Sequence, residues 1–332
     1  MDNLCCFGDS LGARDGHFLH IGGVHPSFAR LGFSRYGHPD HSGTQACLKG
    51  TFCFVFLAVF LAIPRFSAAE YKSQSYPAAH ELFAPLQADP SEPHFGFELG
   101  LPVSHRLVAR IDVGDYLGLY RWALGDVGAL QLNVGGAINT RFDATSSHDL
   151  QVVDFYGNVP LDLRIGRFSA RSMFYHDSSH LGDDYLRQNN IESVKHSWDS
   201  VREILSWDAC NALRLYGGYS GAIHTKPEWD GRQELQGGVE MFFNPSGRGY
   251  WHPYWANDVQ SWARTGWDPT WTSQLGVKTG ESSSLGRGIS YFLQFMRGPR
   301  LEGQFFINRE TIWSAGLKFQ ISDHPFSPSA AP

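Results

Sequence analysis

The chain has 332 residues, of which 42% are hydrophobic and 14% aromatic, and this composition excludes an intrinsically disordered protein. The formal net charge of −6, without any basic cluster interleaved with aromatic residues, excludes an obvious nucleic-acid partner. Four of the five cysteines precede residue 54, so Cys210 alone remains for the rest of the chain. No disulfide framework or cysteine-based zinc site is therefore expected there.

The first element in chain order is the apolar run Phe52–Ile63, which is too short to cross a bilayer as a helix. Lys49 precedes the run, and the small residues 67–69 follow it after a proline break. This order is typical of a secretory signal, so we predict a signal peptide over residues 49–69 with cleavage after Ala69. The protein is then an exported one.

The predicted signal peptide also divides the rest of the chain into segments. Residues 1–48 are interpreted as an N-terminal extension that does not belong to the protein, because signal peptides rarely begin so late. Residues 70–93, rich in proline, are expected to form a periplasmic lead. Residues 94–322 are expected to form the folded domain, and 323–332 a tail.

From about His94 onward, apolar and polar residues alternate with a period of two, which predicts β-strands with one apolar and one polar face. In the stretch Trp313–Ile321, for example, every second residue is apolar while Ser314, Lys318 and Gln320 lie on the opposite face. The candidate strands, in chain order, are 94–101, 105–113, 116–124, 129–141, 150–165 (a strand or a hairpin), 168–179, 196–208, 212–224, 234–244, 250–262, 270–280, 287–297 and 302–321.

Many of these strands have the length that a tilted strand needs to cross a membrane, and ordinary globular strands are shorter. The aromatic residues of 250–271 fall near predicted strand ends, as interfacial girdles do. We therefore predict an all-β fold, an antiparallel transmembrane β-barrel of about 12 strands in the bacterial outer membrane, with lipid as its partner. The alternative is a soluble exported β binding protein. The stretch Val194–Leu205 also fits an amphipathic helix, although a strand or loop suits a barrel better.

Charged residues within these strands are expected to line the barrel interior, where opposite charges fill a small barrel or form a narrow pore for small solutes. Twelve strands leave too little space for a wide general pore. The residues expected in the interior are Arg106, Arg110, Arg164, Lys278 and Lys318, with Asp112, Asp162 and Glu240.

The densest polar cluster of the mature chain lies within residues 174–190, FYHDSSHLGDDYLRQNN. If it begins as a strand, His176, Ser178 and His180 share one face, so an imidazole is able to activate the Ser178 hydroxyl for acyl transfer. A third group is then needed to orient the imidazole, and the candidates are Asp183, Asp184, Asn189 and Asn190. Two alternatives remain, a divalent-cation site formed by the histidines and these aspartates, and a polar strand end without chemistry.

The pattern His176-x-Ser178 followed by Asn190 resembles the catalytic arrangement of the outer-membrane phospholipase A family. The lipid A deacylase barrels are similar as well, but with Glu as the third member. The resemblance to the phospholipases implies that Ser178 is the nucleophile, His176 the base and Asn190 the orienting residue, and that the substrate is an acyl ester of a membrane lipid. The phospholipases have an asparagine directly after the serine, where this chain has Ser179.

Segments 83–99, 174–185 and 253–262 together resemble the bacterial domain-of-unknown-function family 1207, which is grouped with membrane barrels. This second resemblance implies a barrel and supplies no activity or cofactor. The sequence thus predicts an outer-membrane barrel with a structural role or a narrow path for small solutes. The alternative functions are a lipid acyl hydrolase using the His-x-Ser pair, and a soluble exported binding protein.

Overall fold

A computed structural model describes the residues in the ranges 72–78, 81–104, 106–145, 149–244, 249–280 and 288–321. The expectations for the extension 1–48, the signal peptide 49–69 and the tail 323–332 concern residues outside these ranges.

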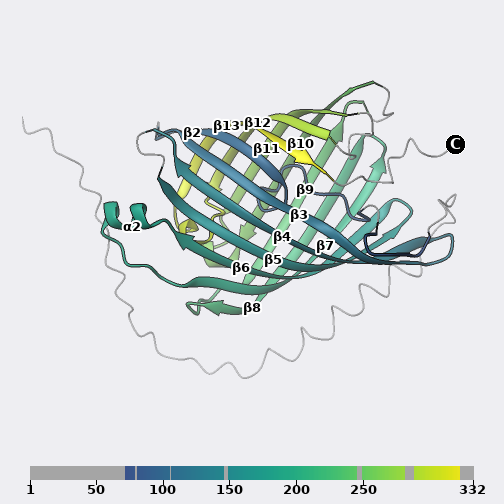
Figure 1. Ribbon diagram of the computed structural model, residues 1–332, viewed down its shortest axis with the longest axis horizontal. Helices are drawn as coiled ribbons and strands as arrows, with labels where there is room; N and C mark the ends of the chain where they lie inside the picture. The colour runs from purple at the N-terminus through teal and green to yellow at the C-terminus, as the bar shows by residue number, and fades with distance from the viewer. Residues whose placement is uncertain are drawn as a thin grey trace, which may run out of the picture. The chain divides into compact units, whose positions relative to one another are not determined.

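The described residues form one antiparallel sheet that closes into a barrel (Figure 1). Strand β13 pairs with β2, so that Phe319 lies opposite Phe95 and the ring has no open edge. A short strand, β1 (Gln74–Ser75), adds to β3 outside this ring. The twelve strands of the barrel are β2 (Phe95–Pro102), β3 (Val108–Ala123), β4 (Gly128–Asp143), β5 (Leu150–Ile165), β6 (Phe168–Leu181), β7 (His196–Cys210), β8 (Leu213–Lys226), β9 (Gln233–Phe242), β10 (Trp251–Trp262), β11 (Pro269–Thr279), β12 (Gly288–Pro299) and β13 (Arg309–Gln320).

The predicted fold class and strand number are confirmed, with changes at three places. The two strands expected over 105–113 and 116–124 are the single strand β3, which continues through a bulge between Gly118 and Tyr120. Residues 150–165 form one strand rather than a hairpin. The strand expected over 302–321 begins only at Arg309, because residues 303–305 form a 3-10 helix. The preferred interpretation of Val194–Leu205 as strand holds from His196 onward, where alternate residues pack into the barrel and override the helical pattern.

The helices of the structure lie in the connections between strands. Helix α2 (Asp183–Asn189) follows β6 at one end of the barrel, and the short 3-10 helices η1 (Ala263–Thr265) and η2 (Gly303–Phe305) precede β11 and β13. None of the described helices is long and apolar enough to span a bilayer.

The outer wall of the barrel is apolar. Leu293 is 61% exposed and Trp313 63% exposed, and the alternating residues of the other strands expose leucine, valine, isoleucine and phenylalanine in the same way. Exposed aromatic residues lie near both barrel ends, one group comprising Tyr120, Trp122, Phe168, Trp207, Tyr250 and Trp251, and the other Trp267, Trp271 and Trp313. An apolar band between two aromatic girdles is the pattern of a lipid-facing barrel wall.

Two aromatic residues expected in the girdles lie inside the barrel instead. Tyr254 is 2% exposed and donates a hydrogen bond to Gln274 Oε1 at 2.8 Å, and Trp262 lines a cavity of the lumen. Both occupy positions whose side chains alternate inward on β10. A cluster of aromatic residues in sequence therefore does not by itself separate girdle positions from lumen positions.

The inner wall of the barrel is polar and densely paired, as predicted. The Arg171 guanidinium donates to both oxygens of Asp162 at 2.7 and 2.9 Å, and Arg214 forms an ion pair of 3.1 Å with Glu240. The interior positions predicted for Arg110, Arg164, Lys278, Asp112, Asp162 and Glu240 are confirmed. Arg106 is an exception, because it lies in the connection before β3 and is exposed.

Residues 81–93, which we call the strap, lie inside the barrel. Sequence analysis assigned them to a lead separate from the barrel, but Leu82, Phe83 and Asp89 are each fully buried among inward-facing side chains. The strap precedes β2 directly and contacts β6, β7, β8 and β9. Its apolar side chains add to those of the wall, as Phe83 and Leu86 do where they pack with Ile204 and Tyr216.

Candidate functional site

Four polar side chains form a row on the mostly apolar outer wall, and we call them the outer-wall cluster; a second outward polar pair, Ser172 and Glu203, lies further along the same two strands. His176, Ser178 and His180 are alternate residues of β6, so all three point outward, as predicted from the period of the strand. Asp199 joins them from β7, where the register places it directly opposite His176. The His176 side chain is 51% exposed and that of Asp199 31% exposed.

The hydrogen bonds of this cluster form two pairs. His176 Nδ1 lies 2.7 Å from Asp199 Oδ1, and Ser178 Oγ lies 3.0 Å from His180 Nε2. The Asp199 carboxylate accepts the Nδ1 proton, which leaves the Nε2 atom of His176 as the proton acceptor. Ser178 lies between the two histidines in the sequence of this strand face, and its hydroxyl is bonded to His180, while His176 is bonded to Asp199.

The structure does not place Asn190 beside His176. Asn190 caps the C-terminus of α2 in the left-handed conformation, with φ of 51°, and its backbone N–H bonds to the last turn of that helix. Asp199 takes the position next to the imidazole that the sequence analysis assigned to Asn190. The sequence analysis did not identify Asp199, because helix α2 lengthens the connection between β6 and β7. The partner strand β7 therefore begins further along the chain than expected.

A metal site in this cluster has little geometric support. Asp183 and Asp184 lie in the first turn of α2 and are exposed, while His176 and His180 are each engaged with another side chain. Among the residues that the structure describes, no group of three or more His, Cys, Asp or Glu side chains is arranged to hold a metal ion.

Inside the barrel, Asp89 is the most heavily bonded residue of the strap. Its carboxylate accepts hydrogen bonds from Arg202 Nη2 at 2.9 Å, from Gln236 Nε2 at 3.0 Å and from Gln260 Nε2 at 2.9 Å. The Ser91 backbone N–H donates a fourth bond of 2.8 Å. The charge of Arg202 and these bonds hold the pKa of Asp89 below its ordinary value, although burial alone would raise it. Side chains from β7, β9 and β10 therefore hold the strap through the Asp89 carboxylate.

Backbone carbonyls of the strap are bonded as well. Arg214 Nη2 donates to Ala84 O at 2.8 Å, and Lys318 Nζ donates to Gln87 O at 2.8 Å. The Gln87 N–H donates in turn to Glu240 at 2.7 Å. These bonds satisfy backbone N–H and C=O groups of the strap, which does not pair with any described strand.

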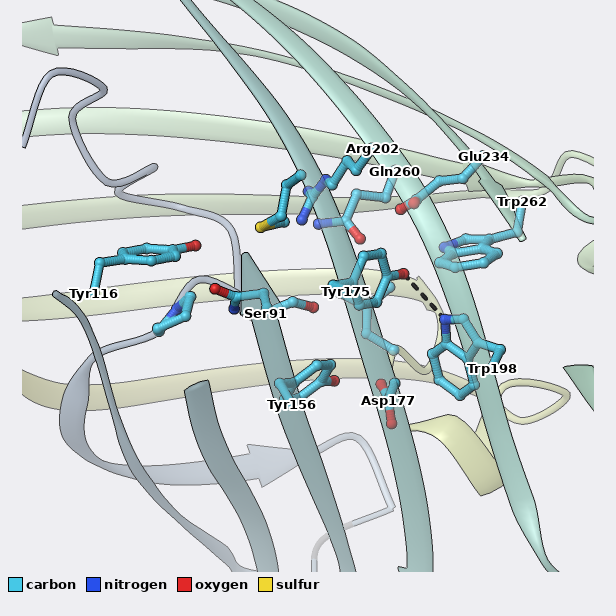
Figure 2. A pocket seen from close by; sticks show the side chains of 14 residues that line it. Ser91, Tyr116, Tyr156, Tyr175, Asp177, Trp198, Arg202, Glu234, Gln260 and Trp262 are labelled. Carbon is cyan, nitrogen blue, oxygen red and sulfur yellow. Dashed lines mark hydrogen bonds between the residues drawn. The ribbon is translucent and has the colours of Figure 1, made fainter. Parts of the chain in front are cut away.

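A cavity remains between the strap and the end of the barrel that carries α2 (Figure 2). The cavity is narrow and partly open to solvent. Ser91 and Pro93 of the strap form one side, and Trp198 Nε1 donates to the Tyr175 hydroxyl across another at 3.0 Å. The remaining wall residues are Tyr116, Tyr156, Asn158, Met173, Asp177, Arg202, Glu234, Gln260, Trp262 and Leu301.

An aromatic cage around Arg264 lies next to this cavity. The guanidinium carbon of Arg264 is 4.3 Å from the centre of the Trp262 ring and 4.5 Å from that of Phe306, and the rings of Trp198 and Trp229 complete the cage. The cage joins β7 and β10 to the connections that follow β8, β10 and β12. Burial lowers the pKa of Arg264, which the nearby carboxylates oppose. These cation–π contacts fix the connections at this end of the barrel.

The closed ring, the apolar outer wall and the polar lumen define this chain as a β-barrel of the outer-membrane type. The chain belongs to the family described as "Protein of unknown function (DUF1207)", which matches residues 65–321. The expected membership is thereby confirmed over most of the chain.

Solved structures with a similar fold include outer-membrane phospholipase A from Escherichia coli, at 12% identity and a TM-score of 0.48, covering 70% of this chain and 98% of that one. The KdgM porin is similar at 11% identity and a TM-score of 0.40, covering 68% and 98%. The NanC porin is similar at 14% identity and a TM-score of 0.42, covering 68% and 99%. The search of curated proteins gave no significant match.

Proposed function

We propose that this protein is an outer-membrane acyl hydrolase that cleaves ester bonds of membrane lipids at its outer wall. The observation that carries the proposal is the outer-wall cluster, in which a histidine held by a carboxylate and a hydrogen-bonded serine share one exposed face. Acids and imidazoles on a lipid-facing wall lower barrel stability, although least near the interfaces. The cluster joins a carboxylate, an imidazole and a serine, whereas the other outward pair on these strands, Ser172 with Glu203, joins only a serine and a carboxylate. A soluble binding protein would leave the apolar outer wall unexplained.

In this proposal Ser178 Oγ attacks the carbonyl carbon of the ester and forms a tetrahedral intermediate. His176 accepts the serine proton and then passes it to the departing alcohol oxygen, which leaves an acyl-serine ester. Water, deprotonated by the same imidazole, attacks this ester and releases the fatty acid while the proton returns to Ser178. Asp199 orients His176 and stabilises its charged form, the role that the sequence analysis gave to Asn190.

We assign the base role to His176 rather than His180 because His176 has the carboxylate partner. His180 accepts or donates the hydrogen bond of the resting Ser178 hydroxyl, and its ring stands edge-on to Phe155. Both histidines lie within two residues of Ser178 on the same face, so variants at each position separate the two roles.

The cluster lies in the part of β6 that leads into α2. The longest described connection, residues 182–195, is at this end of the barrel, whereas the other end has the tight turns 166–167 and 211–212. In outer-membrane barrels the long connections are extracellular and the short turns periplasmic. The proposal therefore places the site in the outer leaflet, which makes lipids of that leaflet the substrate class and the outer membrane the location.

The test is hydrolysis of a phospholipid ester by the purified full-length barrel in mixed micelles. We expect Ser178→Ala to lower the rate by at least about 10³-fold, since loss of the nucleophile leaves only residual catalysis. His176→Ala should have a comparable effect and His180→Ala a smaller one. The matched control is Ser273→Ala, because Ser273 is an outward serine on β11 whose hydroxyl accepts a hydrogen bond from Trp255.

The same measurements give the contrary outcomes. Wild-type protein that releases no fatty acid from phospholipid or from a lipid A ester overturns the proposed activity. Hydrolysis that survives Ser178→Ala overturns the assignment of the nucleophile. Activity that survives His176→Ala and disappears in His180→Ala would transfer the base role to His180.

A further inference from the structure

We infer that the lumen cavity of Figure 2 is a binding site for a small organic cation, a function separate from hydrolysis at the outer wall. The inference begins with Asp177, whose side chain is fully buried and lines the cavity. Among the described residues, Tyr156 is the one side chain that interacts with this carboxylate as a hydrogen-bond donor, and the geometry of that contact is poor. A buried carboxylate without a well-placed partner is costly unless a ligand of opposite charge compensates it.

The remaining charges around the cavity favour a cation over an anion. Glu234, only 2% exposed, contributes a second carboxylate to the wall. The one arginine in the wall, Arg202, is already paired with Asp89 of the strap at 2.9 Å. Arg264 contacts the Trp198 and Trp262 rings, and its charge interacts with both Asp177 and Glu234. Three carboxylates, Asp89, Asp177 and Glu234, thus face two arginines, which leaves one negative charge in excess around the cavity.

The rest of the wall suits an organic cation rather than a metal ion. Three tyrosines (Tyr116, Tyr156 and Tyr175) and two tryptophans (Trp198 and Trp262) surround the space, and Figure 2 shows Tyr156 and Tyr175 beside Asp177. Aromatic faces attract substituted ammonium groups through their negative quadrupole, and desolvation in an enclosed site strengthens that attraction. Two carboxylates offer too few ligands for a dedicated divalent-cation site. We therefore assign an alkylammonium group as the ligand chemistry.

The experiment is titration calorimetry of the refolded full-length barrel with tetramethylammonium, compared with tert-butanol, a neutral molecule of similar shape and size. The inference expects saturable binding of tetramethylammonium and none of tert-butanol at the same concentrations. Asp177→Asn should weaken binding by at least about 10-fold, the effect of losing one charge interaction of roughly 1.4 kcal/mol. Trp262→Leu should weaken it as well.

Asp126→Asn is the control variant, since Asp126 is an exposed acid in the turn between β3 and β4. Glu234→Gln serves as the second test if Asp177→Asn fails to fold, because it removes the other carboxylate of the same wall. Absence of tetramethylammonium binding overturns the inference. Equal binding of tert-butanol, or unchanged binding in a folded Asp177→Asn or Glu234→Gln variant, overturns it too. Loss of lipid hydrolysis in Ser178→Ala leaves these results unaffected, so the two sites are tested independently.

Discussion

The inner and outer walls of this barrel contain polar side chains for different reasons. Inside, charged groups such as Arg171, Asp162 and Asp89 bind one another and the strap, so the structure alone accounts for them. Outside, His176, Ser178 and Asp199 interrupt a mostly apolar surface, and their side-chain bonds are to one another and to His180 on β6 and β7. The comparison teaches that burial and pairing explain a polar group in the lumen, whereas a polar row on the outer wall needs a functional explanation.

The strongest test of this contrast is Asp162→Ala. It leaves the fully buried Arg171 without its main partner, and loss of one member of a buried ion pair costs about 3–5 kcal/mol. We expect the free energy of unfolding to fall by that amount in urea titrations of the barrel in lipid. The double variant Asp162→Leu/Arg171→Met should recover much of the loss, and equal stability of wild type and Asp162→Ala would refute the view of the lumen as a paired network.

The second test places a charge on the outer wall. Leu293 lies at the centre of β12 and points outward, so Leu293→Arg should cost about 2–4 kcal/mol in a bilayer. Val103→Arg, in the connection between β2 and β3, is the control and should cost almost nothing. The comparison of unfolding free energies in lipid vesicles measures both. Similar values for the two variants would mean that the outer wall does not face lipid.

A smaller effect is expected at Glu302, in the connection between β12 and β13. Burial alone would raise its pKa, but the charges of Arg300, Arg141 and Arg110 outweigh burial and hold the pKa well below the ordinary value. A depressed pKa contributes stability above the unfolded-state pKa of about 4.3, and that stability is lost as the pH falls further. Glu302→Gln should therefore cost about 1.5–3 kcal/mol at neutral pH.

The pH dependence provides the control for this prediction. The stability difference between wild type and Glu302→Gln should shrink as the pH is lowered below about 4.3, because the wild-type carboxyl then loses its advantage. Unfolding by urea at a series of acidic pH values measures it. A difference that is constant with pH would show that the arginines do not stabilise the charged form of Glu302.

The smallest effect on stability is expected at His176, where the proposed function predicts a large effect on hydrolysis. His176→Phe replaces an exposed polar side chain by an apolar one on a lipid-facing wall, so the free energy of unfolding should change by less than about 0.5 kcal/mol or rise slightly. Hydrolysis should be abolished in the same sample. A loss of stability comparable to that of Asp162→Ala would give His176 a structural role and remove the basis of the functional interpretation.

The sequence predicted the parts of this molecule that depend on local pattern. Period-two alternation predicted the strands, the outward direction of His176 and Ser178, and the inward direction of Arg110 and Asp162. It did not predict Asp199 as the partner of His176, because that contact depends on the register between β6 and β7 across a long connection. The strap was also missed, since an irregular segment has no periodicity to show that it fills a lumen.

The position of the strap in the chain constrains how the molecule is assembled. The strap ends directly before β2, and β2 forms the seam with β13, the pairing that joins the most distant strands of the sequence. Pairing across such a separation is slow compared with the hairpins that build the rest of the wall. The chain therefore encloses the strap when β2 and β13 close the ring.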